Sequence, residues 1–261
     1  MLKVKDLKVQ YGKQAPTVEH FDLDMKQGEI ISIVGESGSG KTTVIRSILH
    51  ALPSQTRVAA ATLEFEGKSL LTMTNSQWSD LRGTDISMIF QDSGATLNPI
   101  RRIGKQYVDY IRTHRKMSVK EAVVLAEGML AKMGLPDAKR VMNRYPYQLS
   151  GGMCQRVGIA MAMTFQPKLL LADEPTSALD VTTQVQIVKE MMELRDTYGT
   201  SIIIVTHNLG VAAYMADQLI VMKNGRIEDK GSTEKVLSQP ESEYTKKLLQ
   251  AVPELEGYRF V

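Results

Sequence analysis

One short glycine-rich segment constrains this chain more than any other feature. Residues 35–42 read Gly-Glu-Ser-Gly-Ser-Gly-Lys-Thr, which matches the pattern G-x-x-x-x-G-K-[S/T]. The segment follows an apolar stretch at 30–34 and precedes a helical pattern that runs to His50, so a strand-loop-helix unit is expected. The backbone N–H groups of such a loop and the helix N-terminus favour a bound phosphate. The segment therefore predicts a nucleoside triphosphate site; the alternative is a glycine-rich turn without a ligand.

The polar residues of this loop have candidate tasks. Lys41 would neutralise the charge of the β- and γ-phosphates, and the hydroxyl of Thr42 would bind Mg²⁺. The candidate nucleotide-binding residues of the segment are Gly35, Glu36, Ser37, Gly38, Ser39, Gly40, Lys41, Thr42 and Thr43.

Two kinds of apolar pattern predict an α/β fold. In the first 31 residues Phe21, Leu23 and Met25 alternate with charged residues, which is typical of an antiparallel sheet with one solvated face. The segments 30–34, 168–173 and 201–205 are nearly continuous apolar runs, as in parallel strands that are covered on both sides. Because helical patterns separate these runs, a sheet of crossover units is expected.

The pattern between about residues 98 and 163 is helical. Ser118 and Glu121 form a capping-box signature, and apolar residues follow at helical spacing until Gly134 and Pro136 end the segment. We therefore expect one domain over 1–261, with a nucleotide-binding core at 1–95 and 160–261 and a helical subdomain at 96–159.

Composition excludes several classes of protein. Thirty-two Lys and Arg against 29 Asp and Glu leave a net charge of +3, which is too weak to indicate a nucleic-acid partner. The single cysteine, Cys154, excludes an internal disulfide and fits a reducing compartment. No apolar run approaches the roughly 18 residues of a membrane span, and the N-terminus lacks the apolar centre of a secretory signal. We therefore expect the chain to stay in the cytosol.

Two carboxylates follow the second apolar run. Asp173 and Glu174 stand at the C-terminal end of a predicted buried strand, where ligands of α/β sheets collect. Asp173 suits the coordination shell of Mg²⁺, and Glu174 could polarise an attacking water as a general base. A solvated turn is the alternative for an acidic pair of this kind.

Further motifs resemble those of the ATP-binding cassette (ABC) ATPases over nearly the whole chain. The segment 149–156, Leu-Ser-Gly-Gly-Met-Cys-Gln-Arg, resembles the family's signature motif, and 173–180 resembles its Walker B end and D-loop. Gln91 resembles the Q-loop glutamine, His207 the switch histidine, and Tyr11 the aromatic residue that stacks on adenine. The resemblance implies ATP and Mg²⁺ as cofactors, Glu174, His207 and Gln91 as catalytic residues, and Thr42, Gln91 and Asp173 at the metal. It also implies a P-loop NTPase (RecA-like) core with an N-terminal antiparallel β subdomain and an inserted helical subdomain.

The signature segment has a physical reading of its own. Ser150 with Gly151 and Gly152 opens a helix whose first N–H groups are unpaired, which makes a second anion site. The resemblance implies that this helix end, with Gln155 and Asp180, contacts the ATP held by a second ABC ATPase. Whether that partner is an identical or a related chain stays open.

Narrower features are similar to the oligopeptide, dipeptide and nickel importer subfamily. They are Phe90-Gln91-Asp92, the segments 97–99, 103–106 and 172–182, and Tyr244-Thr245-Lys246-Lys247-Leu248-Leu249. Two departures are Asn208, where an aspartate commonly follows the histidine, and Ser93-Gly94-Ala95, which replaces a proline-containing turn. The chain ends without the cysteine-bearing extension that is frequent in the peptide branch, which favours the short nickel-type subunits.

This resemblance predicts an ATPase subunit that powers uptake of peptides or of nickel or another chelated metal. Its expected partners are integral membrane permease subunits, a second ABC ATPase and, indirectly, an extracellular solute-binding protein, with the chain bound at the cytoplasmic face of the membrane. The alternative is a non-transport ABC ATPase of a phosphonate (carbon-phosphorus lyase) assembly, which is similar around residues 206–212 and 222–225. A kinase or GTPase shares only the phosphate loop and has no use for the helix at Ser150.

Overall fold

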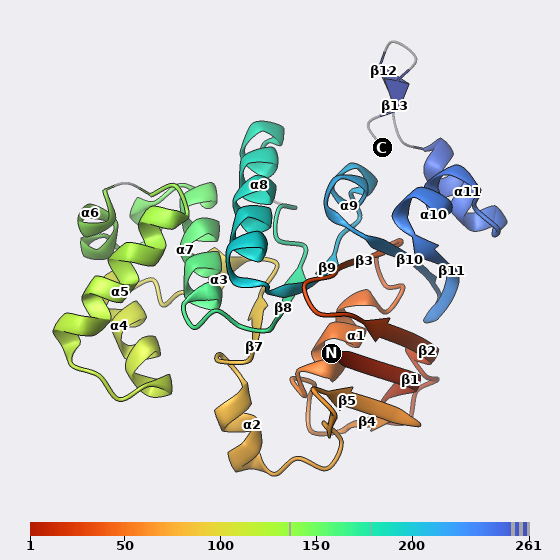
Figure 1. Ribbon diagram of the computed structural model, residues 1–261, viewed down its shortest axis with the longest axis horizontal. Helices are drawn as coiled ribbons and strands as arrows, with labels where there is room; N and C mark the ends of the chain where they lie inside the picture. The colour runs from red at the N-terminus through yellow and green to blue at the C-terminus, as the bar shows by residue number, and fades with distance from the viewer. Residues whose placement is uncertain (136, 178, 252–253, 256–257, 260–261) are drawn as a thin grey trace. The chain divides into compact units, whose positions relative to one another are not determined.

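The computed structural model describes residues 1–135, 137–177, 179–251, 254–255 and 258–259. Its contacts divide the chain into two compact units (Figure 1). The first unit comprises residues 1–75 and 201–261, and the second comprises residues 76–200.

An antiparallel sheet forms one part of the first unit. Its strand order is β2-β1-β5-β6, and β4 also pairs with β1. Phe21, Leu23 and Met25 are at most 1% exposed, while the charged residues between them are exposed. The predicted alternation is therefore confirmed. The strands are β1 (Leu2–Tyr11), β2 (Val18–Met25), β4 (Thr56–Ala59), β5 (Thr62–Phe65) and β6 (Lys68–Ser69).

Parallel strands form the other part of the first unit. Strand β3 (Ile30–Val34) pairs in parallel with both β9 (Ser201–Val205) and β10 (Gln218–Lys223). Every residue of β3 and β9 is buried, as predicted for strands covered on both faces. Strand β11 (Arg226–Ser232) continues this sheet antiparallel to β10. Two short strands, β12 (Glu254–Leu255) and β13 (Tyr258–Arg259), pair with each other.

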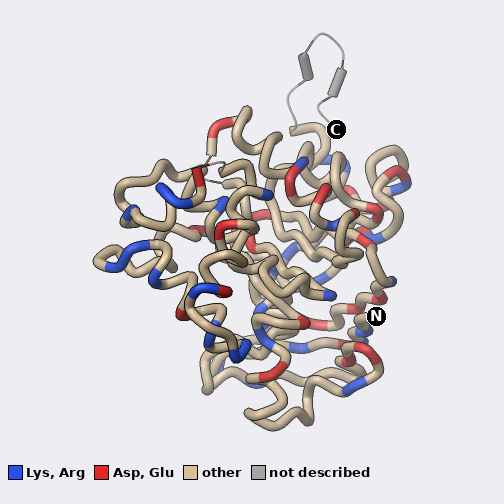
Figure 2. Tube along the Cα trace, turned by 60° about the vertical axis from the view of Figure 1, so that its left-hand side comes forward, with Lys and Arg blue, Asp and Glu red and all other residues tan. Residues whose placement is uncertain are grey.

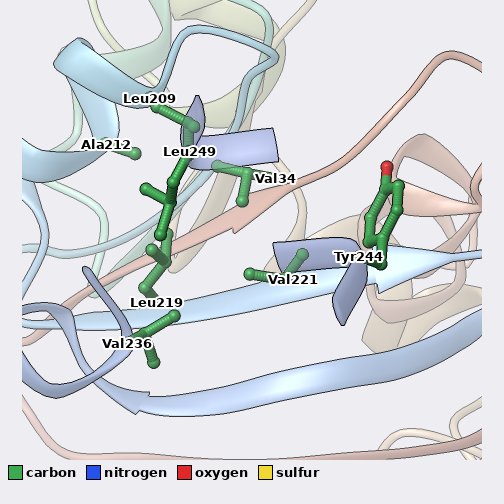
Figure 3. Packing of buried hydrophobic residues seen from close by; sticks show 8 residues of the cluster. All are labelled: Val34, Leu209, Ala212, Leu219, Val221, Val236, Tyr244 and Leu249. Atoms are coloured by element: carbon green, nitrogen blue, oxygen red, sulfur yellow. The ribbon is translucent and has the colours of Figure 1, made fainter. Parts of the chain in front are cut away.

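Four helices accompany these strands in the described part of the first unit. They are α1 (Lys41–Ile48), α9 (Leu209–Met215), α10 (Thr233–Ser238) and α11 (Glu243–Gln250). Figure 3 shows side chains from β3, β10, α9, α10 and α11 gathered in one apolar cluster: Val34, Leu209, Ala212, Leu219, Val221, Val236, Tyr244 and Leu249. This cluster fixes the last helices of the chain to the strand that precedes the phosphate loop.

The second unit combines a parallel strand pair with helices. Strand β7 (Ile86–Ile89) pairs with β8 (Leu169–Asp173), all of whose residues are buried. A short 3₁₀ helix covers Pro146–Gln148. The α-helices are α2 (Asn75–Leu81), which begins at the last residue of the first unit, α3 (Ser93–Thr96), α4 (Ile103–His114), α5 (Val119–Lys132), α6 (Ala138–Asn143), α7 (Gly151–Met163) and α8 (Val181–Tyr198).

The predicted capping box is present at the start of α5. The hydroxyl of Ser118 accepts from the backbone N–H of Glu121, and the carboxylate of Glu121 accepts from the backbone N–H of Ser118. The helix ends before Gly134, as predicted, whereas Pro136 lies outside the described residues. The helical segment 96–159 falls wholly in the second unit. The assignment of domains at its boundaries stays a prediction.

Charged residues of both signs are interspersed along the chain (Figure 2), in keeping with the net charge of +3. Among the described residues, no helix has both the length and the apolar character that crossing a membrane requires.

Candidate functional site

The phosphate loop begins where the backbone leaves β3 at Gly35. The φ of this residue is +146°, and a Cβ added to it would lie 2.1 Å from the carbonyl oxygen of Met222. No L side chain fits a backbone approach of that kind. Gly35 therefore allows the loop to fold closely against the end of β10.

Lys41, the first residue of α1, is only 5% exposed. Its Nζ donates to the carbonyl oxygens of Gly35 and Glu36, each at 2.8 Å, and lies 3.5 Å from the hydroxyl of Ser39. The loop thus surrounds a buried ammonium group with its own carbonyls. Because a buried charge is stabilised by an opposite charge, an anion such as a phosphate fits this loop.

Tyr11 ends strand β1 beside the helix that follows the loop. Its hydroxyl lies 3.2 Å from the hydroxyl of Thr43, within hydrogen-bond distance. Thr43 is buried, whereas Tyr11 and Thr42 are half-buried. The structure therefore brings the predicted aromatic residue to the phosphate loop; its stacking on adenine stays a prediction.

His207 is exposed just after β9, in the same unit as the phosphate loop. The next residue, Asn208, caps α9: its Oδ1 accepts from the backbone N–H groups of Gly210 at 2.9 Å and Val211 at 3.2 Å. Asparagine and aspartate both supply the oxygen that an N-cap needs. The departure at Asn208 therefore preserves the helix start after His207.

The register of β7 and β8 brings two predicted catalytic residues together in the second unit. Ile89 stands opposite Ala172, and Gln91 and Glu174 each follow two residues later. The amide Nε2 of Gln91 donates to the carboxylate Oε2 of Glu174 at 3.3 Å. The carboxyl ends of two parallel strands thus deliver an amide and a carboxylate to one point, as parallel sheets do at their ligand sites.

Glu174 has an unusual backbone conformation for a residue with a side chain. Its φ is +45°, in the left-handed region, immediately after the buried Asp173. Such conformations cost of order 1–3 kcal/mol and are concentrated at functional sites. The turn separates two adjacent carboxylates, so that Asp173 is 1% exposed while Glu174 is half-buried.

The predicted second anion site lies at the start of α7. Ser150 caps this helix by accepting from the backbone N–H of Met153 at 3.3 Å. Ser150 and Gly151 are exposed and Gly152 is half-buried, so the helix end is open to a ligand. Gln155 is 6% exposed, and its Nε2 has no hydrogen-bond partner in the part of the chain that the structure describes. This burial indicates that Gln155 helps to pack helix α7.

Asp180 caps the next helix, α8. Its carboxylate accepts from the hydroxyl of Thr183 at 2.7 Å and from the backbone N–H of Thr183 at 3.0 Å. These hydrogen bonds lower the pKa of Asp180, because they stabilise the charged carboxylate. Within the predicted D-loop, Ala178 lies outside the described residues.

The model of the ABC transporter family matches residues 18–177 of this sequence. This chain belongs to the ABC transporter family. As a member, it is an ATPase that binds and hydrolyses ATP.

Relatives of this ABC protein match it over nearly its whole length. It is 40% identical over 261 residues to the oligopeptide transport ATP-binding protein OppD of Bacillus subtilis, covering 98% of this chain and 73% of that protein. It is 41% identical over 257 residues to the dipeptide transport ATP-binding protein DppD of Haemophilus influenzae, covering 97% of this chain and 78% of that protein.

Solved structures of ABC cassettes share the fold. The cassette MJ0796, a dimer in a post-hydrolysis state bound to ADP and Pi, has a TM-score of 0.76 at 29% identity and covers 89% of this chain and 99% of that one. The structure of cbiO1 from Clostridium perfringens, part of the transporter complex cbiONQ, has a TM-score of 0.76 at 28% identity, covering 92% and 91%. The predicted P-loop fold is therefore confirmed.

The candidate metal ligands of this ABC protein have the right chemistry for Mg²⁺. Thr42, Gln91 and Asp173 present oxygen atoms, which are the ligands that Mg²⁺ takes in proteins, usually with phosphates and waters completing the shell. Thr42 belongs to the first unit, and Gln91 and Asp173 belong to the second.

Sequence reasoning missed two residues that support the site. The hydroxyl of Tyr244 accepts from the backbone N–H of Glu36 in the phosphate loop, at 3.2 Å. Gly158 of α7 lets Ser93 of α3 approach so closely that an added Cβ would lie 2.5 Å from its hydroxyl oxygen. Tyr244 stands in a subfamily-like segment, but 208 residues separate it from Glu36. No local pattern signals a contact over that separation.

Proposed function

We propose that this chain is the ATP-hydrolysing subunit of an importer of peptides, acting with separate membrane permease subunits. Identity of about 40% over nearly the full chain with oligopeptide and dipeptide transport ATP-binding proteins supports the substrate class. That observation carries the proposal, because the ATPase core alone is shared by cassettes with many tasks.

Each group of site residues has one task in ATP binding or hydrolysis. The loop 35–43 binds the phosphates, with Lys41 neutralising their charge, and Tyr11 stacks on the adenine. Thr42, Asp173 and Gln91 hold Mg²⁺, which offsets phosphate charge when bound. The burial of Lys41 among loop carbonyls supports the assignment of the loop.

Glu174 is the proposed general base. Its carboxylate accepts a proton from the attacking water, an effect worth roughly 10²- to 10⁴-fold in rate. Gln91, whose amide donates to that carboxylate, orients it, and His207 assists at the terminal phosphate. The contact between Gln91 and Glu174 supports this pairing of tasks.

A second ABC ATPase, identical or related, completes the proposed machinery. The exposed helix end at Ser150, Gly151 and Gly152 would contact nucleotide held by that partner, with Gln155 and Asp180 supporting it. The dimeric state of the similar cassette MJ0796 supports this arrangement. Association is then coupled to nucleotide occupancy, because a ligand held by both partners stabilises the dimer.

The chain would bind permease subunits at the cytoplasmic face of the membrane through its helical segment 96–159, and an extracellular solute-binding protein would deliver the peptide. The relatives described above favour peptides, and none of them supports the nickel or phosphonate alternatives.

Two measurements in the native cell test the substrate class. Affinity purification of this chain from detergent-solubilised membranes should recover permease subunits. Loss of the chain should abolish uptake of radiolabelled di- and oligopeptides, and the wild type should restore it, whereas Lys41→Ala should not. Recovery of phosphonate-processing enzymes, or loss of nickel uptake with unchanged peptide uptake, would contradict the proposal.

A further inference from the structure

Tyr244 connects the last long helix of the first unit with the phosphate loop. Its ring belongs to the apolar cluster of that unit, which also contains Val34 of β3 and Val221 of β10 (Figure 3). Its hydroxyl oxygen accepts from the backbone N–H of Glu36 at 3.2 Å. Val34 directly precedes the loop, so Tyr244 shares an apolar cluster with the strand that leads into the loop and hydrogen-bonds to the loop itself.

The start of helix α11, which carries Tyr244, is fixed by hydrogen bonds. The carboxylate of Asp229, 7% exposed on β11, accepts from the backbone N–H groups of Glu241 at 3.1 Å and Ser242 at 3.0 Å. Ser242 in turn caps the helix by accepting from Thr245. The Tyr244 hydroxyl is therefore presented from a rigid support.

The Tyr244 ring is held on a second side as well. The ammonium group of Lys223, at the end of β10, lies 4.5 Å from the ring centroid, a cation–π contact. Burial raises the pKa of Tyr244, because it disfavours the charged phenolate. The contact with Lys223 therefore adds to the interactions that hold the ring in place.

Glu36 is held from both sides of its backbone. Its N–H donates to Tyr244, and its carbonyl accepts from Lys41 at 2.8 Å. Phosphate binding requires the backbone of this loop in one conformation, and affinity falls in proportion to the fraction of molecules that leave it. A hydroxyl that fixes the first peptide of the loop therefore lowers the fraction of molecules that leave this conformation.

We propose that Tyr244 is a positioning residue of the phosphate loop, whose hydroxyl holds Glu36 in the nucleotide-binding conformation and makes ATP affinity depend on the seating of helix α11. This inference rests on the proposed role of the loop in binding MgATP. It also implies regulation: a partner that displaces α11 lowers ATP affinity, and bound ATP stabilises the seated helix by the same factor, because linkage is reciprocal.

Tyr244→Phe is the sharpest test, since it removes one oxygen atom and keeps the ring in the apolar cluster. The matched control is Tyr214→Phe in α9 of the same unit, where the tyrosine is 57% exposed. Calorimetric titration with MgATP should show a Kd three- to tenfold higher, on the order of one lost hydrogen bond, for Tyr244→Phe. Tyr214→Phe should match the wild type.

The melting temperature separates positioning from support of the fold. Loss of one hydrogen bond should lower it by no more than about 4 °C in a chain of this size. A purely structural Tyr244 would change the melting temperature of the nucleotide-free protein and leave the Kd unchanged. An unchanged Kd for Tyr244→Phe would overturn the inference.

Amide hydrogen exchange in the wild type gives a second measurement that needs no variant. The N–H of Glu36 should exchange slowly without nucleotide, although the residue is exposed. Exchange as fast as that of an unbonded surface amide would also overturn the inference. A wild type that binds no MgATP would refute the proposed function instead, and the exchange rate of Glu36 would still decide whether Tyr244 holds the loop.

Discussion

Gly35 is the residue at which backbone space most tightly limits the phosphate loop. A Cβ there would meet the Met222 carbonyl at 2.1 Å in addition to adopting a positive φ. Gly28, in the turn before β3, also has a positive φ, of +72°, but an added Cβ would meet nothing within 4 Å. An alanine at Gly28 would therefore meet backbone strain alone, whereas an alanine at Gly35 would meet both backbone strain and a steric clash.

Gly35→Ala should lower the free energy of unfolding by about 3 kcal/mol or more and weaken MgATP binding, because the loop must move to admit the methyl group. Gly28→Ala should cost only about 1 kcal/mol and leave MgATP binding unchanged. Urea unfolding followed by circular dichroism measures the free energy of unfolding, and calorimetry measures the affinity for MgATP. Equal losses of stability in the two variants would show that the contact with Met222 is unimportant.

Single residues of the site were predictable where a local pattern encodes their chemistry. The spacing of glycines and Lys41 located the phosphate loop, and an apolar run ending in two carboxylates located Asp173 and Glu174. The hydrogen bond between Gln91 and Glu174 depends on pairing between β7 and β8, and the contact of Tyr244 with Glu36 depends on the packing of α11. These interactions join distant parts of the chain, which leave no periodic signal.

The packing of α7 against α3 gives a prediction at the scale of elements. An added Cβ at Gly158 would lie 2.5 Å from Oγ and 2.6 Å from Cβ of Ser93, whereas at Gly128 in α5 it would meet nothing within 4 Å. Both glycines lie inside helices of the second unit, so alanine has the same intrinsic advantage in each. Gly128→Ala should stabilise the chain by about 0.5–1 kcal/mol, and Gly158→Ala should destabilise it by about 1–3 kcal/mol.

Chemical denaturation of the two variants measures these opposite effects. Ser93→Gly removes both contacting atoms, so the double variant with Gly158→Ala should recover part of the lost stability. Stabilisation by Gly158→Ala of the same size as by Gly128→Ala would show that α3 and α7 do not approach as the structure describes.

The capping box of α5 predicts a pH dependence. Ser118→Ala removes the hydroxyl that caps the helix and should cost about 1 kcal/mol at pH 7. Hydrogen bonds from the backbone N–H of Ser118, foremost, and from its hydroxyl, at 2.7 Å, lower the pKa of Glu121 below its usual value of 4.5. A carboxylate with a lowered pKa stabilises the fold above its unfolded pKa and loses that contribution as the pH falls through the folded pKa.

The stability difference between the wild type and Ser118→Ala should therefore be smaller at pH 3 than at pH 7, because only the wild type has the hydroxyl that donates to the charged carboxylate of Glu121. Urea titrations at the two pH values measure it. A difference that grows on acidification would contradict the capping geometry.

Elements were predictable to different degrees. The apolar runs at 30–34 and 201–205 became β3 and β9, since continuous burial leaves a strong signal. Strands β7 and β10 were not singled out from the sequence. Four residues, Ile-Ser-Met-Ile, are too few in β7 to distinguish a strand from a helical turn, and only its pairing with β8 makes it one.

At the scale of the whole molecule, the candidate residues belong to both units. The phosphate loop, Tyr11 and His207 lie in the first unit, and Gln91 and Glu174 lie in the second. Family membership was recognisable from the sequence because its motifs occur in order along one chain. The ATPase motifs do not identify the permease partners. The proposed substrate class therefore depends on the similarity of the chain to its relatives.

The loop 35–43 and Glu174 together define the proposed chemistry of this chain, which binds MgATP at the loop and hydrolyses it with Glu174. The most direct test is the rate of phosphate release at saturating MgATP from the wild type and from Glu174→Gln. Calorimetry establishes saturation in each case, and Lys41→Ala serves as the control that should lose nucleotide affinity. We predict that Glu174→Gln binds MgATP like the wild type and releases phosphate at least about 10²-fold more slowly. An undiminished rate of phosphate release would contradict the account.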